Sequence, residues 1–123
     1  MRVGLVSPER ALWEGEAESV YARTLDGELG ILPGHIPTLV VLAEQGTVRI
    51  QPAGGEPLVV AAVSGGFLSV SGDGVSILAE TAVFADEIDL AEAQAALSAA
   101  EPGSSDALVA QGRVDAATYA GRR

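Results

Sequence analysis

The stretch Phe67–Ala79, FLSVSGDGVSILA, predicts a β-hairpin. Residues 67–71 and 75–79 each alternate between side chains of different size and polarity, and a period of two is typical of strands. Gly72-Asp73-Gly74 separates the two runs, and an Asp-Gly pair favours a tight turn because both residues tolerate positive φ. This segment therefore predicts strand pairing late in the chain.

The same β pattern extends over residues 1–85. Short runs of Val, Leu and Ile are separated by Gly and Pro, and residues 47–50 and 58–63 flank a second turn at Gln51–Pro57. We expect a mainly β fold, a flattened sandwich or barrel of about ten strands. Aromatic residues make up only 4% of the chain, so we expect a core of Val, Leu, Ile and Ala. Trp13 and Phe67 are predicted to join it, with an exposed aromatic contact as the less favoured alternative.

The pattern changes to a helical period at Asp86. Asp89 is a candidate N-cap with Glu92 three residues later, and Pro102-Gly103 ends this helix before Ser104–Asp106 caps another. We expect an antiparallel two-helix hairpin in residues 86–123. Its apolar stripes are predicted at Leu90, Ala93, Leu97 and Ala100, and at Leu108, Val109, Ala116 and Tyr119.

Composition excludes several classes of function. The 123 residues carry a net charge of −10, and all seven cationic residues are Arg. Such a chain is repelled by nucleic acids and by anionic lipid headgroups, so neither is an expected partner. Cysteine is absent, and the longest apolar stretch, Leu58–Val63, is too short to span a bilayer. We expect a soluble protein, or one held at a membrane through a protein partner.

No catalytic set emerges from the residues. His35 is the one histidine, Val63-Ser64-Gly65-Gly66 lacks the first glycine of a nucleophile elbow, and a chain without Lys has no Walker A motif. Glu14, Glu16 and Glu18 alternate and are expected to form a solvated strand face. We therefore predict no enzyme activity, metal site or cofactor, and a protein that works by binding other proteins.

One stretch points to a family. Gly27–Pro37, GELGILPGHIP, resembles the signature of F-type ATP synthase epsilon subunits. Further stretches agree with the same family in the same order. They are Val6–Arg10 with Trp13 and Gly15, Gly65–Val70, and Val75–Glu80 followed by Asp86–Asp89.

The resemblance implies a non-catalytic central-stalk subunit that couples proton flow to ATP synthesis. Its sandwich, residues 1–85, would bind the gamma subunit and rest on the c-ring loops, at the cytoplasmic face of the bacterial cell membrane. Glu28 would face the c-ring, and His35 and Pro37 would lie near the foot of gamma, while Gly30 permits a close backbone approach. The hairpin, residues 86–123, would be a regulatory arm that restrains ATP hydrolysis when it extends toward the catalytic alpha and beta subunits.

The tail departs from the family pattern in two ways. Some members bind ATP through a segment like Ile-Asp-x-x-Arg-Ala, which here is Ile88–Ala93 with Glu92 in place of the Arg. Because a carboxylate repels phosphate, we predict weak or absent ATP binding by Asp89 and Glu92. The last helix is also short and of mixed charge, so inhibition through Arg113, Arg122 and Arg123 is a hypothesis.

Two other functions stay open at this point. One is an unrelated protein-interaction β-sandwich, which would not associate with a rotary ATPase. The other is a small-molecule sensor with the hairpin as a lid, which a ligand would stabilise against heat. An enzyme ranks behind both.

Overall fold

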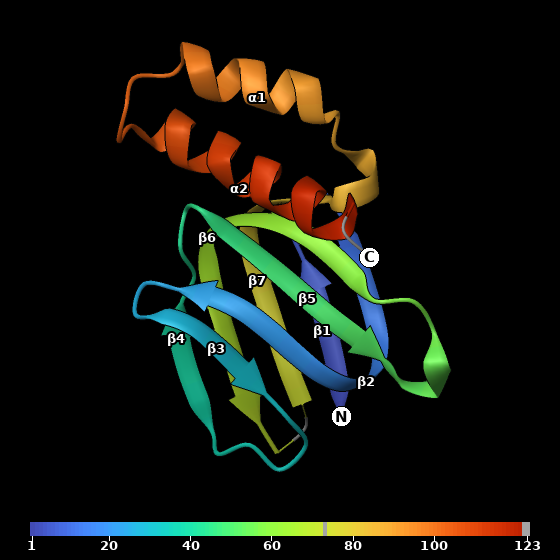
Figure 1. Ribbon diagram of the computed structural model, residues 1–123. Coiled ribbons are helices and arrows are strands. Elements are labelled where there is room, and N and C mark those ends of the chain that lie inside the picture. The colour runs from blue at the N-terminus through green and yellow to red at the C-terminus, as the bar shows by residue number, and fades with distance from the viewer. Residues whose placement is uncertain (73, 122–123) are drawn as a thin grey trace.

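The computed structural model describes residues 1–72 and 74–121, and its order of elements is strands first, then helices (Figure 1). The strands are β1 (Arg2–Val6), β2 (Ala11–Thr24), β3 (Gly27–Ile31), β4 (Thr38–Val41), β5 (Gly46–Pro52), β6 (Val59–Ser71) and β7 (Gly74–Phe84). Short 3₁₀ turns lie at Ala53–Gly55 and Ala85–Glu87, and the helices are α1 (Leu90–Ala99) and α2 (Ser105–Gly121). The expected mainly β fold with a C-terminal helical pair is confirmed.

The strands form a flattened barrel. Their hydrogen-bonded order is β1-β7-β6-β5-β2-β3, and β1 also pairs with β2, so five strands close into a ring. β3 extends the ring beside β2, and β4 pairs with the second half of β6. The pairing of β1 with β7 is parallel, and the predicted β6–β7 hairpin is present, with Phe67 opposite Leu78.

The described residues form seven strands, fewer than the ten or so expected, because three strands are long. β2, β6 and β7 contain 14, 13 and 11 residues, and each serves more than one neighbour. β6 bends at Gly65-Gly66, where both residues have positive φ. A Cβ on Gly66 would lie 1.9 Å from the carbonyl oxygen of Leu78. Only glycine fits this close approach. The bend lets one continuous strand take part in both faces of the flattened barrel.

The core between the layers is aliphatic, as composition predicted. Its fully buried large side chains are Leu5, Ile31, Ile50, Leu68, Ile77, Val3, Val20 and Val48. Trp13 packs only at the margin of this core. Phe67 was predicted to be a core residue, and that was wrong: half of its side chain is exposed.

The helical pair begins where the sequence predicted. Asp89 accepts a hydrogen bond from the Glu92 amide at 3.1 Å, which confirms the N-cap, and Ser104 accepts one from the Ala107 amide at 3.2 Å. α2 lies on the outer side of β5 and the first half of β6, and α1 packs on α2, farther from the strands (Figure 1). The hairpin therefore touches the barrel chiefly through α2.

The predicted apolar stripe of α2 is mostly wrong. Ala116 is buried, but Tyr119 is exposed and Leu108 and Val109 are only half-buried. The buried positions are Ala107, Ala110, Gly112 and Ala116. A Cβ on Gly112 would lie 3.1 Å from the backbone nitrogen of Gly46, so this glycine lets α2 approach β5 closely. Small residues, not large ones, form this contact.

Candidate binding surfaces

An exposed apolar row crosses the outer side of β4, β6 and β7. Val41 lies opposite Phe67, and Phe67 lies opposite Leu78, so the three side chains share one face. Leu39 lies two residues before Val41 on the same side. These four side chains, here called the apolar row, are between 44% and 71% exposed. A contiguous apolar patch on a soluble protein typically marks an interaction site.

The strand period contained the signal for this row. Leu68 and Val70 are buried, so the alternation places Phe67 with Ser69 on the opposite, outward side. An aromatic residue between small polar neighbours on a strand is therefore a candidate contact. Sequence analysis ranked this alternative for Phe67 below a core position.

The signature residues separate into two places. His35 and Pro37 line a groove of about 410 Å³ together with Met1, Leu32 and the end of β6. It lies at the end of the barrel away from the helices, where the β3–β4 connection and the β6–β7 turn meet (Figure 1). His35 is half-buried, and its Nδ1 lies 2.7 Å from the Ile36 carbonyl oxygen. The backbone amide of His35 donates to the Leu32 carbonyl at 3.1 Å and closes the turn.

Glu28 and Gly30 lie on β3 instead, beside β2. Glu28 Oε1 accepts a hydrogen bond from Arg49 Nη2 at 2.5 Å. Gly30 lies against Tyr21, because a Cβ there would be 2.8 Å from Tyr21 Cε1. These two signature positions therefore contact residues of the chain itself, which sequence analysis did not anticipate.

Asp89, Glu92 and Arg113 do come together. They line a groove of about 540 Å³ between the two helices and the end of β7, with a floor largely of Ala. Glu87 and Asp106 also border it, so four carboxylates face one guanidinium. This charge balance opposes phosphate binding, in the direction predicted from Glu92. Arg122 and Arg123 lie outside the described residues.

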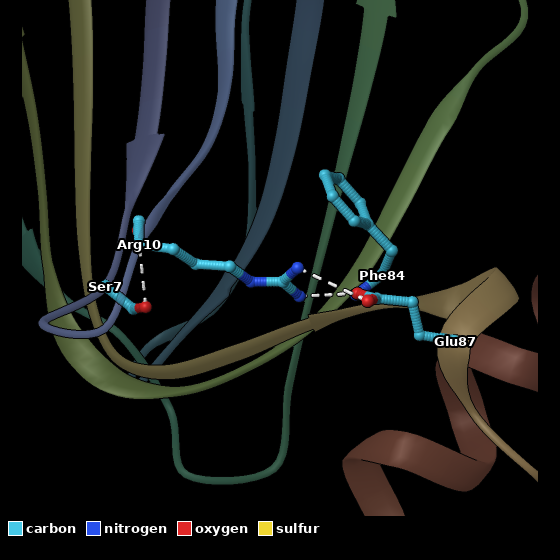
Figure 2. Close-up of polar contacts among 4 residues, drawn as sticks. All are labelled: Ser7, Arg10, Phe84 and Glu87. Carbon is cyan, nitrogen blue, oxygen red and sulfur yellow. Dashed lines mark hydrogen bonds and ion pairs between the residues drawn. The ribbon is translucent and has the colours of Figure 1, made fainter.

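An ion pair holds the base of the hairpin. Arg10 donates to both carboxylate oxygens of Glu87, at 2.5 and 3.3 Å, and its guanidinium lies 5.4 Å from the centre of the Phe84 ring (Figure 2). The Phe84 amide donates to the same carboxylate at 3.0 Å. The hydrogen bond from Arg10, supported by that amide, lowers the pKa of Glu87, and the same bond raises the pKa of Arg10.

Among the described residues, no three His, Cys, Asp or Glu side chains are grouped so that they could bind a metal ion. Within residues 1–72 and 74–121, no helix has the length and hydropathy needed to cross a membrane. The described residues form a β-barrel with an apolar outer row and a helical arm.

Residues 1–85 match the family described as ATP synthase, Delta/Epsilon chain, beta-sandwich domain. The whole chain resembles curated relatives named ATP synthase epsilon chain. It is 48% identical to that of Corynebacterium diphtheriae over 121 residues, which cover 98% of this chain and 93% of the relative. The relative from Frankia casuarinae is 57% identical over 82 residues, which cover 67% of this chain and 94% of that one.

A solved structure supports the assignment over the full fold. A chain in the structure of the Euglena gracilis mitochondrial ATP synthase, OSCP/F1/c-ring, is 26% identical to this one with a TM-score of 0.69. The match covers 96% of this chain and 79% of that chain. A chain of the Tetrahymena thermophila mitochondrial ATP synthase central stalk and c-ring shares the fold, with a TM-score of 0.59 and 20% identity over 98% of this chain and 95% of that one. The chain belongs to the ATP synthase delta/epsilon family, and within it to the epsilon chains.

Proposed function

We propose that this chain is a non-catalytic central-stalk subunit of an F-type ATP synthase that turns with the rotor. Membership of the epsilon chains makes it a subunit of that enzyme complex. The similar chain of Euglena gracilis lies in a mitochondrial ATP synthase assembly of OSCP, F1 and the c-ring. In this role the chain helps to couple proton flow to ATP synthesis and is peripheral at the cytoplasmic face of the membrane.

The apolar row is the observation that carries the proposal. α2 covers the outer side of the first half of β6, while the second half, with Phe67, stays open beside Leu39, Val41 and Leu78. A subunit that stays bound to the rotor needs a large apolar contact with a neighbouring rotor subunit, and this row supplies the centre of that contact. We assign the row to the gamma subunit.

The two ends of the barrel suit different contacts. The groove with His35 and Pro37, at the end away from the helices, is assigned to the foot of gamma and the adjoining c-ring loops. Glu28 lies apart from this groove, on β3, and its side chain is 52% exposed, so a cationic group of a partner can reach it. The hairpin at the other end is the part that can reach the alpha and beta subunits if it leaves the barrel.

We propose that residues 1–85 and 86–123 act as separate units. The principal core cluster contains no residue beyond Ala82, so the barrel does not depend on the hairpin for its centre. The Frankia relative is nearly fully covered by 82 aligned residues, so an epsilon chain can be about as long as the barrel alone. The hairpin is then an added regulatory arm.

Mixing the chain with gamma and the catalytic subunits tests this function. We expect co-elution on size exclusion and a changed ATPase rate. Phe67→Ser should weaken co-elution at least tenfold, since a buried central aromatic contributes ~2 kcal/mol or more. Leu25→Ser, which removes an exposed apolar side chain outside the row, is the matched control. Failure of the unaltered chain to bind would reject the proposal.

A further inference from the structure

Four residues that are paired across neighbouring strands form a second row, on the outer side of β3, β2, β5 and β6. Gly30 lies opposite Tyr21, Tyr21 opposite Arg49, and Arg49 opposite Val60. Because Gly30 lacks a side chain, the Tyr21 ring can occupy the space above it. The signature glycine thus determines where Tyr21 lies, and Tyr21 borders Arg49.

Arg49 lies between two tyrosine rings. Its guanidinium carbon is 5.2 Å from the centre of the Tyr21 ring and 4.8 Å from that of Tyr119, near the end of α2. Both distances fit a cation–π contact. The Arg49 side chain is 20% exposed and Glu28 is 52% exposed, with their ion pair at 2.5 Å. Glu28 therefore orients the guanidinium that holds the end of the hairpin.

We propose that the Glu28–Arg49 pair is a coupling device that seats Tyr119 and so links the signature strand β3 to docking of the hairpin. Arg49 acts as a positioning residue, because its contact with Tyr119 depends on the orientation that Glu28 imposes. Freed from the carboxylate, the guanidinium regains rotamers that do not face Tyr119.

The device responds to a partner of defined chemistry. An Arg or Lys side chain presented to Glu28 competes with Arg49 for the same carboxylate. The partner then favours the undocked hairpin by its differential contact with the two states. This consequence rests on the proposed function, which brings Glu28 to a rotor surface, whereas the intramolecular link does not.

Hydrogen exchange of the full chain in isolation tests the link. Glu28→Gln removes the charge of the carboxylate but keeps its shape. We expect exchange of the α2 amides, residues 113–121, to become about fivefold faster, as for one weak ion pair and one cation–π contact. Exchange in β7 should stay unchanged. Glu14→Gln is the matched control, because it breaks the exposed Arg2–Glu14 pair, which involves no residue of the hairpin.

A double-mutant cycle separates coupling from a local effect. Tyr119→Leu should also speed α2 exchange, and adding Glu28→Gln to it should change the rate no further, because both act through Arg49. The proposal is overturned if the two increases in α2 exchange rate multiply in the double variant. It is also overturned if Glu28→Gln exchanges at the wild-type rate. Co-elution of the unaltered chain with gamma is measured separately, so failure of the proposed function is distinguished from failure of the link.

Discussion

At the scale of the residue, the signature Gly27–Pro37 has more than one physical role. Pro37 and His35 shape a groove at one end of the barrel, and Glu28 and Gly30 organise side chains on its outer face. Gly30 has no positive φ, so its importance here is space and not backbone freedom. A side chain at this position would displace the neighbouring tyrosine.

Gly30→Ala is expected to lower the free energy of unfolding by about 1 kcal/mol, because the new Cβ would be 2.8 Å from Tyr21 Cε1 and the ring must move. Urea unfolding measures the change. Gly4→Ala provides the control, since no atom lies within 4 Å of a Cβ there and its φ is not positive. This control should be neutral or slightly stabilising. Equal values for the two variants would contradict the packing argument.

At the scale of the element, the hairpin is held at its base by the Arg10–Glu87 pair and along its length by small residues. Gly112 and Ala116 let α2 lie close to β5 and β6, and few large side chains are buried with them. Burial of so little apolar area gives a modest docking energy. The hairpin can therefore separate from the barrel without disturbing the main core.

The Arg10–Glu87 ion pair at the base of the hairpin predicts that stability depends on pH. The folded chain has a Glu87 pKa below the ordinary value of 4.5, so protons bind Glu87 more readily in the unfolded chain. The stabilisation is present above pH 4.5 and is lost as the pH falls through the lower, folded pKa. Arg10 stays charged throughout this range.

Urea unfolding of wild type and Glu87→Gln at several pH values tests the contribution of the Arg10–Glu87 ion pair. We expect the difference in unfolding free energy between the two to be largest at neutral pH and to shrink below pH 4.5, the ordinary pKa of Glu87. Other carboxylates titrate in both chains, so they cancel in the difference. A difference that stays constant with pH would show that the charge of Glu87 does not contribute.

The groove between the helices predicts poor nucleotide binding. Four carboxylates and Arg113 border it, so calorimetry with ATP at millimolar concentration should detect no binding. Glu92→Arg should strengthen the interaction by placing a cation in the groove. Glu101→Arg makes the same change in charge outside the groove lining and should have no effect. Millimolar or tighter binding by the unaltered chain would refute the prediction.

At the scale of the whole molecule, the chain has two hydrophobic cores of unequal size. The larger lies inside the barrel, and the smaller joins Val60, Ala62, Ala85 and Ala116 beneath α2. Strand pairs carry most of the contacts between distant segments, and they close the barrel without the helices. The barrel is thus expected to be the stable unit and the hairpin the adjustable one.

Removing residues 86–123 should leave a folded barrel. We expect cooperative thermal unfolding with Tm lowered by about 10 °C, since uncovering Val60 and its neighbours costs about 2 kcal/mol. The shortened chain should still co-elute with gamma, and ATPase activity of the assembled enzyme should rise if the hairpin restrains hydrolysis. Unchanged activity would reject that restraint, and loss of the cooperative transition would reject the independence of the barrel.

Local sequence determined the parts of this protein that depend on neighbours in the chain. The alternation around Phe67–Ala79, the Asp89 cap and the Pro102-Gly103 break follow from backbone preferences over a few residues, and Gly27–Pro37 identified the family. Tertiary structure alone decided what depends on distant pairing. It joined Arg49 to Glu28 and Tyr119, exposed Phe67 beside Val41 and Leu78, and closed the barrel with long bent strands. Such contacts follow from strand register and helix docking, which no single segment specifies.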